Sequence, residues 1–216
     1  HDAAPDGIKF LQKDLRHAAL MKVYPQAEGK WSGVCGYFGH LYAGRGVEII
    51  ESMAEARPDI LFLLFGGTEV DLQERRKNNC CTNLRYVGHV PHPVAQQAMK
   101  SVDVLLMPYQ ESVAIGISGH DTARWMSPMK MFEYMGAGVP IISSDLPVLR
   151  EVLSDGENAL LVPPSNSESW ILALDRLLND EELSNAIGVC AHNDYKAKYT
   201  WKKRAHCLIE AAKELK

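Results

Sequence analysis

The stretch Ile60-Leu61-Phe62-Leu63-Leu64-Phe65, followed by Gly66-Gly67, is the part of the sequence that decides the fold class. The run has the length of a strand, and no polar residue alternates with the apolar ones. A strand that is apolar at every position is buried on both faces, which is typical of parallel sheets covered by helices on both sides. Further runs of this kind span residues 34–41, 84–90, 102–107, 139–143 and 159–162.

Helical patterns separate the apolar runs, so strands and helices alternate along the chain. This alternation predicts an α/β fold with a doubly wound, Rossmann-like parallel sheet of six strands and extra C-terminal helices. We expect a lead-in and a helix over residues 1–33, the Rossmann-like domain over 34–180, and helices that pack on it over 181–216. The last helix carries an apolar stripe of Trp201, Ala205, Leu208, Ala212 and Leu215.

Composition and charge exclude several functional classes. The 216 residues carry a formal net charge of −4, so the chain lacks the basic field that favours nucleic-acid binding. No apolar run approaches the length of a membrane span. Five cysteines without a C-x-x-C spacing indicate neither a disulfide framework nor a zinc site, and they fit a reducing cytosol. His89 and His92 lack a third ligand, so we predict no metal site.

The loop after the first run reads Gly39-His40-Leu41-Tyr42-Ala43-Gly44-Arg45-Gly46 and opens a helical pattern. In an open parallel sheet, ligands bind beyond the carboxyl ends of the strands. Such a loop exposes amides to an anion, and Arg45 adds a bidentate phosphate donor. An ordinary turn with a solvated Arg45 explains the segment equally well. The pattern G-x-G-x-x-G and the Walker A loop are absent, so hydride transfer and ATP hydrolysis lose their usual support.

A second segment, Ser-Pro-Met-Lys-Met-Phe-Glu-Tyr-Met-Gly-Ala-Gly-Val-Pro, begins at Ser127. Ser127 fits the N-cap of a helix and Pro128 its first position. The free amides of Met129 and Lys130 would then face a phosphate, and the Lys130 ammonium would neutralise it. Glu133, about one turn further on, could accept hydrogen bonds from the hydroxyls of a ribose. The alternative is a capped amphipathic helix with Lys130 and Glu133 in solvent.

The segment 108–126 is a long polar loop after the fourth run. Loops of this length inside compact domains are usually functional or disordered. The strand before this loop ends at the same edge of the sheet as the strand before the loop that contains Arg45. Glu111 and Asp121 are its ionisable candidates for a ligand contact.

Together these motifs resemble the C-terminal, donor-nucleotide-binding half of a GT-B glycosyltransferase of retaining family 4, of the type found in bacterial O-antigen and surface polysaccharide synthesis. The segment from Ser127 to Pro140 is the most specific part, because it is similar to the branch that reads Ser-Pro-x-Lys-x-Phe-Glu-Tyr-Met. The resemblance spans nearly the whole chain. Its other parts are residues 36–41, 45–46, 87–90, 107–109, 155–162 and 199–201.

The resemblance implies a role for each candidate residue. Glu133 would bind the ribose, Arg45 and Lys130 would hold the diphosphate, and these three residues would carry catalysis. The backbone near residues 89–91 would frame the base. The family often has Arg where this chain has His40, and Glu where it has Trp125. The residues implied in nucleotide binding are Gly39, His40, Arg45, His89, Val90, Ser127, Met129, Lys130 and Glu133.

The resemblance also implies a reaction. A hexose or N-acetylhexosamine would move from a UDP-linked sugar nucleotide to a saccharide or lipid-linked acceptor, without a metal or another cofactor. The acceptor would bind the N-terminal half of the enzyme, so we expect the chain alone to bind nucleotide without transferring sugar. The last helix, with Trp201, would pack towards the side of that other half.

We expect a cytoplasmic enzyme, peripheral to the inner membrane through its N-terminal half. Two alternatives stay open at this point. One is a non-hydrolysing sugar-nucleotide epimerase of similar architecture. The other is a nucleotide-binding module without catalysis.

Overall fold

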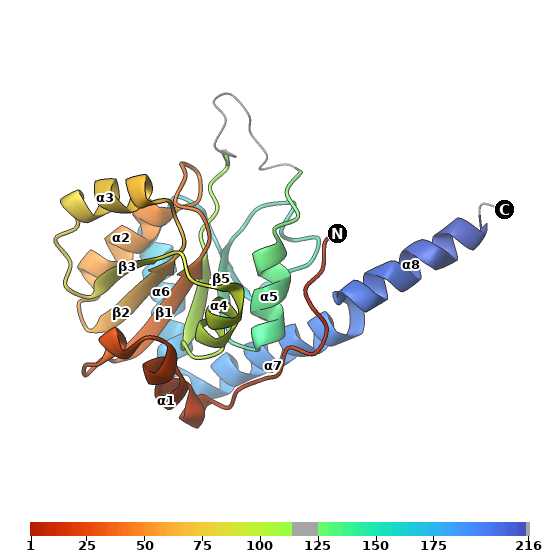
Figure 1. Ribbon diagram of the computed structural model, residues 1–216, viewed down its shortest axis with the longest axis horizontal. Coiled ribbons are helices and arrows are strands. Elements are labelled where there is room, and N and C mark those ends of the chain that lie inside the picture. Colours follow the sequence, from red (N-terminus) through yellow and green to blue (C-terminus); the bar gives the residue numbers. More distant parts are fainter. Residues whose placement is uncertain (114–124, 215–216) are drawn as a thin grey trace.

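The computed structural model describes residues 1–113 and 125–214. These residues form a six-stranded sheet in the order β3-β2-β1-β4-β5-β6, in which all neighbouring strands are parallel (Figure 1). Each apolar run of the sequence holds one strand, so the predicted doubly wound fold is confirmed. The strands are β1 Gly33–Phe38, β2 Ile60–Phe65, β3 Leu84–Gly88, β4 Val104–Met107, β5 Ile141–Ser144 and β6 Leu160–Val162.

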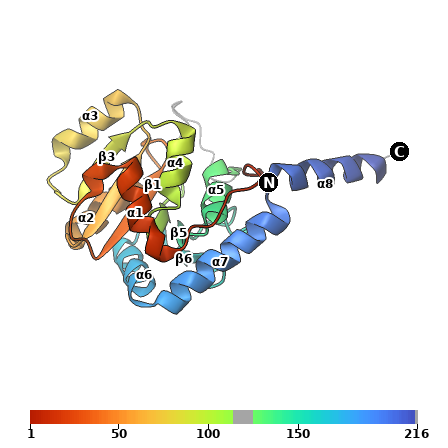
Figure 2. The same ribbon diagram turned by 60° about the horizontal axis from the view of Figure 1, so that its bottom comes forward.

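Helices cover both faces of the sheet (Figure 2). Side chains of α2, α3 and α6 belong to a hydrophobic cluster on one face, and side chains of α1, α4 and α5 to a cluster on the other; α7 contributes to both clusters. The helices are α1 Lys13–Val23, the 3-10 turn η1 Pro25–Ala27, α2 Val47–Ala56, α3 Glu69–Asn78, α4 His92–Met99, α5 Met129–Ala137, α6 Ser167–Asn179, α7 Glu181–Lys198 and α8 Trp201–Glu214.

Strand β2 shows how the sequence pattern produces the layers. Its side chains are at most 3% exposed, and alternate residues join the two hydrophobic clusters. Burying one such side chain contributes roughly 1.5–3 kcal/mol. The apolar run therefore stabilises both helical layers at once.

Helix α5 is fixed to the sheet by the buried side chain of Tyr134. The Tyr134 hydroxyl accepts a hydrogen bond from the Phe38 amide at 2.8 Å and donates one to the Leu106 carbonyl at 3.4 Å. Phe38 ends β1, and Leu106 lies near the end of β4. One hydroxyl thus joins α5 to the carboxyl ends of two neighbouring strands.

The lead-in, residues 1–12, runs beside the C-terminal helices before α1 begins at Lys13. Ala4 forms a parallel bridge with Thr200, and the Tyr195 hydroxyl donates to the Pro5 carbonyl. Closer to the N-terminus, the Asp2 amide donates to the Ser127 hydroxyl at 2.7 Å. The lead-in therefore contacts both the C-terminal helices and the approach to α5.

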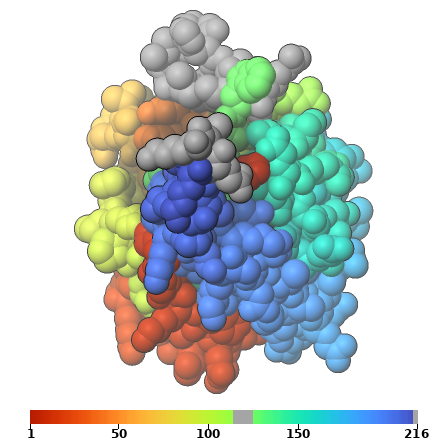
Figure 3. Space-filling model, turned by 90° about the vertical axis from the view of Figure 1, so that its right-hand side faces the viewer, coloured from red at the N-terminus to blue at the C-terminus, as the bar shows by residue number. Residues whose placement is uncertain are grey.

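The two C-terminal helices are placed differently. Helix α7 packs on α5 and α6, whereas α8 meets the lead-in at its first turn, where the Trp201 amide donates to the Ala4 carbonyl. Helix α8 projects away from the body (Figure 1) and therefore points towards the viewer in Figure 3. Trp201 and Leu208 are 41% and 62% exposed. The packing of the whole segment 181–216 on the domain stays a prediction for α8, whose apolar stripe is largely exposed in the described residues; Leu215 falls outside them. None of the described helices has the length and apolarity needed to cross a membrane.

The anchoring role of Tyr134 can be tested by Tyr134→Phe. The change leaves the Phe38 amide and the Leu106 carbonyl without this partner in a buried place, so we expect the free energy of unfolding to fall by about 1–3 kcal/mol. Urea denaturation measures this loss. Tyr24→Phe is the matched control, because no described residue forms a hydrogen bond with the Tyr24 hydroxyl; an equal effect of the two changes would contradict the role.

Candidate functional site

The candidate site lies where β1 and β4 end side by side in the sheet. From this point the chain winds outward in both directions, which leaves a crevice beyond the carboxyl ends of the two strands. Two hollows of about 460 and 640 Å³ occupy the crevice. They share Phe38, Gly39 and His40, so they form one continuous cleft.

The loop after β1 is held against the loop after β4 by close backbone contacts. Gly46 has a φ of +75°, and a Cβ atom on it would lie 1.7 Å from the Pro108 carbonyl oxygen. A Cβ atom on Gly44 would lie 2.1 Å from the carbonyl oxygen of Ser112. Only glycine permits this approach, which turns Arg45 towards the cleft between the two loops.

Arg45 is half-buried and lies against an aromatic ring, unlike the solvated Arg45 of an ordinary turn. Its Nη1 donates to the Tyr109 hydroxyl at 3.0 Å, and its guanidinium carbon lies 5.2 Å from the Tyr109 ring centroid. The Arg45 Nε atom is buried and has no hydrogen-bond partner among the described residues. The guanidinium therefore keeps donor capacity for a ligand.

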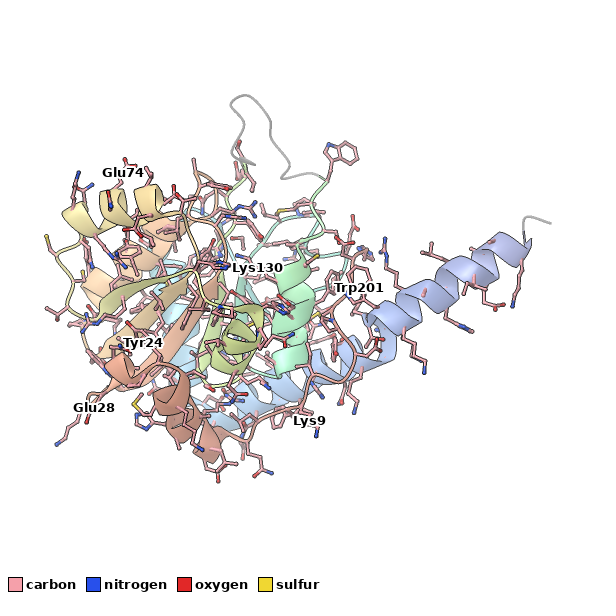
Figure 4. The ribbon with its side chains drawn as sticks, in the orientation of Figure 1. Lys9, Tyr24, Glu28, Glu74, Lys130 and Trp201 are labelled. Carbon is pink, nitrogen blue, oxygen red and sulfur yellow. The ribbon has the colours of Figure 1, made fainter. Side chains whose placement is uncertain are left out.

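Lys130 lies at the start of α5, near the carboxyl ends of the strands (Figure 4). Its Nζ lies 4.2 Å from the ring centroid of Tyr37 and 4.5 Å from that of Tyr109. Burial lowers the pKa of Lys130 well below its usual value, and the nearby positive charge of Arg45 lowers it further. Within the described part of the chain, neither cation has a carboxylate partner. Two basic side chains that lack a carboxylate partner among the described residues form a site suited to an anion.

The start of α5 differs by one residue from the prediction. Pro128 is the N-cap and Met129 the first helical residue, so Pro128 does not hold the first helical position. Ser127 does not cap the helix, because its hydroxyl accepts the Asp2 amide. The amides of Met129 and Lys130 still stand in the first turn, where an α-helix lacks internal partners and favours negative charge.

Glu133 faces the same cleft, and its side chain is only 12% exposed. Its Oε1 lies 2.6 Å from Nε2 of His92, the first residue of α4. In the sequence, His92 is only a weak metal candidate, and nothing there indicates this contact. A single histidine does not reveal a partner on another helix.

The remaining predicted residues divide between the two hollows. Gly39 and His40 line both, and the exposed His40 ring stacks on Tyr42 at 4.6 Å. His89 and Val90 line the smaller hollow. Ser127 and Met129 line the larger one.

The loop after β4 contributes an aromatic side chain to the cleft. Trp125 is 85% exposed and lines the larger hollow. Glu111 is exposed and is not among the described residues that line the two hollows. Asp121, the other predicted candidate of the loop, lies outside the described residues. The described part of the chain contains no cluster of three His, Cys, Asp or Glu side chains that could hold a metal.

Comparison with known proteins identifies the family. Residues 33–180 match the family model described as glycosyl transferases group 1, so the chain belongs to this family. It is 27% identical to the phosphatidyl-myo-inositol mannosyltransferase of Mycolicibacterium smegmatis, over 83% of this chain and 43% of the relative. It is 28% identical to that of Mycobacterium tuberculosis, over 91% of this chain and 50% of the relative. The chain thus spans about half the length of these relatives.

Solved structures share the fold. The C-terminal domain of a group 1 glycosyltransferase from Francisella tularensis aligns over 86% of this chain and 93% of that one, with 19% identity and a TM-score of 0.65. HepE from Anabaena, in complex with UDP-glucose, aligns over 96% and 54%, with 16% identity and a TM-score of 0.74. The matches support the C-terminal half of a GT-B enzyme, while the mannosyltransferase names of the curated relatives do not single out O-antigen synthesis.

The close contact of the two loops can be tested by Gly46→Ala. The new Cβ atom meets the Pro108 carbonyl, and the positive φ adds strain, so we expect the free energy of unfolding to fall by at least about 2 kcal/mol. Gly156→Ala is the matched control, because Gly156 has a φ of +74° with no atom within 4 Å of the added Cβ. Urea denaturation of both variants separates the clash from the strain; equal losses would show that the loops do not depend on this contact.

Proposed function

We propose that the chain is the donor-binding half of a retaining glycosyltransferase. The enzyme moves a hexose or N-acetylhexosamine from a nucleoside diphosphate sugar, UDP-linked in our proposal, to a saccharide or lipid-linked acceptor in surface polysaccharide synthesis. The observation that carries the proposal is the pair Arg45 and Lys130, two cations without an acid partner among the described residues, in the same cleft as the Glu133 carboxylate.

The cleft offers a place for each part of the donor. In the proposed arrangement, the base occupies the smaller hollow beside His89 and Val90. The ribose hydroxyls donate to Glu133, which lines the adjoining hollow. The diphosphate lies at Arg45, Lys130 and the amides that begin α5. The sugar then extends towards the acceptor side of the cleft.

Catalysis in this proposal rests on stabilising the leaving diphosphate. Negative charge grows on the phosphate oxygens as the bond to the sugar breaks, and preformed cations lower the energy of that state. Arg45 and Lys130 are held in place by the rings of Tyr37 and Tyr109 before the donor arrives. No reorganisation of these side chains is then needed during the reaction.

The relatives support this proposal at the level of the family. The curated ones are named as mannosyltransferases, and the HepE structure holds UDP-glucose. Because the chain spans about half of these relatives, we propose that the acceptor binds another domain. The chain alone would then bind nucleotide without transferring sugar. We further propose a cytoplasmic enzyme that reaches the inner membrane peripherally through that other domain.

The ribose contact can be tested by Glu133→Ala. We expect the affinity for UDP, measured by titration calorimetry, to fall at least about tenfold, because the ribose loses hydrogen bonds to a charged acceptor. Glu74→Ala is the control, because Glu74 is exposed on α3, away from Lys130 (Figure 4). If the unchanged chain binds neither UDP, GDP nor their sugars, the proposed function is wrong.

The diphosphate contact predicts a pH dependence. The pKa of free Lys130 is lowered, and a bound diphosphate raises it, so binding takes up a proton wherever the pH exceeds the free pKa. The affinity for UDP is therefore constant below the free pKa and falls as the pH rises towards the bound pKa.

Calorimetry above pH 7.5, in buffers that differ in ionisation enthalpy, measures this proton uptake without interference from the phosphate or from ordinary histidines. Lys130→Met should weaken binding and remove the uptake. An uptake of the same size in Lys130→Met would assign the proton to another group.

A further inference from the structure

The contact between His92 and Glu133 joins the two hollows of the cleft. His92 lines the smaller hollow and Glu133 the larger one. The two residues come from α4 and α5, helices that follow different strands of the sheet. Their 2.6 Å contact between Nε2 and Oε1 is therefore a link across the boundary at which a nucleotide would pass from base to ribose.

The contact leaves half of the carboxylate available. A carboxylate accepts about four hydrogen bonds through its two oxygens, and His92 uses Oε1 alone. Among the described residues, no other side chain bonds to Glu133. The Oε2 atom can thus accept from a ligand while His92 keeps its place.

We propose that His92 is a positioning residue for the ribose of the donor. Its Nε2–H donates to Oε1 and holds the carboxylate in the orientation in which Oε2 meets the ribose hydroxyls. The inference rests on the proposed function, in which Glu133 binds the ribose. His92 itself touches no reacting atom.

Physical reasons favour positioning over a purely structural role. His92 is 58% exposed, so its side chain contributes little to the core, whereas Glu133 is 12% exposed and depends on few partners. A hydrogen bond to a charged acceptor is stronger than a neutral one. A carboxylate that is already oriented also loses less side-chain freedom when the nucleotide binds.

The test compares the binding of two nucleotides by the unchanged chain and by its variants at His92 and Glu133. UDP carries both ribose hydroxyls, and 2′,3′-dideoxyuridine diphosphate carries neither. Titration calorimetry gives both affinities for the unchanged chain, His92→Ala, His92→Gln, Glu133→Ala and the double variant that combines His92→Ala with Glu133→Ala. The glutamine amide nitrogen can take the place of Nε2, so His92→Gln keeps the donor while removing the ring.

We expect His92→Ala to weaken UDP binding about fivefold to tenfold and to leave the dideoxy nucleotide almost unchanged. The ratio of the two affinities, which measures the preference for ribose, should therefore fall, and His92→Gln should restore most of it. In the Glu133→Ala background, the preference should be absent whether or not His92 is present. A loss of folding alone would weaken both nucleotides equally. His17→Ala, a change on the exposed face of α1, serves as the surface control.

Two outcomes would overturn the inference while leaving the proposed function in place. In the first, His92→Ala keeps the ribose preference although Glu133→Ala loses it. In the second, His92→Ala binds UDP more tightly, which would make His92 a competitor for the carboxylate. Failure of the unchanged chain to bind any nucleotide would instead overturn the proposed function and this inference with it.

Discussion

The geometry of the cleft depends on the two hydrogen bonds of the Tyr134 hydroxyl. This hydroxyl is buried and bonds to the last amide of β1 and to a carbonyl near the end of β4. The two strands are neighbours in the sheet, but the helices that follow them cover opposite faces. By joining α5 to both strands, the hydroxyl sets the distance between the loop that carries Arg45 and the helix that carries Lys130 and Glu133.

The cations of the cleft are held by rings and not by acids. An acid partner would stabilise Lys130 but would also repel a diphosphate, whereas the faces of Tyr37 and Tyr109 attract the cation without cancelling its charge. Without an acid partner, the charged form of Lys130 is unfavourable in its buried place, and this lowers its pKa. A bound anion stabilises the charged form, so the arrangement favours the occupied cleft.

The sequence predicts the strands well and the contacts between elements poorly. The run Ile60–Phe65 coincides with β2 because burial on both faces leaves a pattern in the sequence itself. The contact between His92 and Glu133 leaves no such pattern, because its partners lie on two helices and meet only in the folded chain. The apolar stripe of α8 is similarly uninformative about contacts: exposed residues such as Trp201 and Leu208 predict that a partner exists, but not where it lies.

The hydrogen bond from the Asp2 amide connects the lead-in to Ser127, which lines the cleft. The lead-in is paired with Thr200 at the junction of α7 and α8, and Ser127 stands just before the first turn of α5. The approach to the anion-binding amides is therefore held by three segments that are distant in the sequence: the lead-in, the junction of α7 and α8, and the residues just before α5.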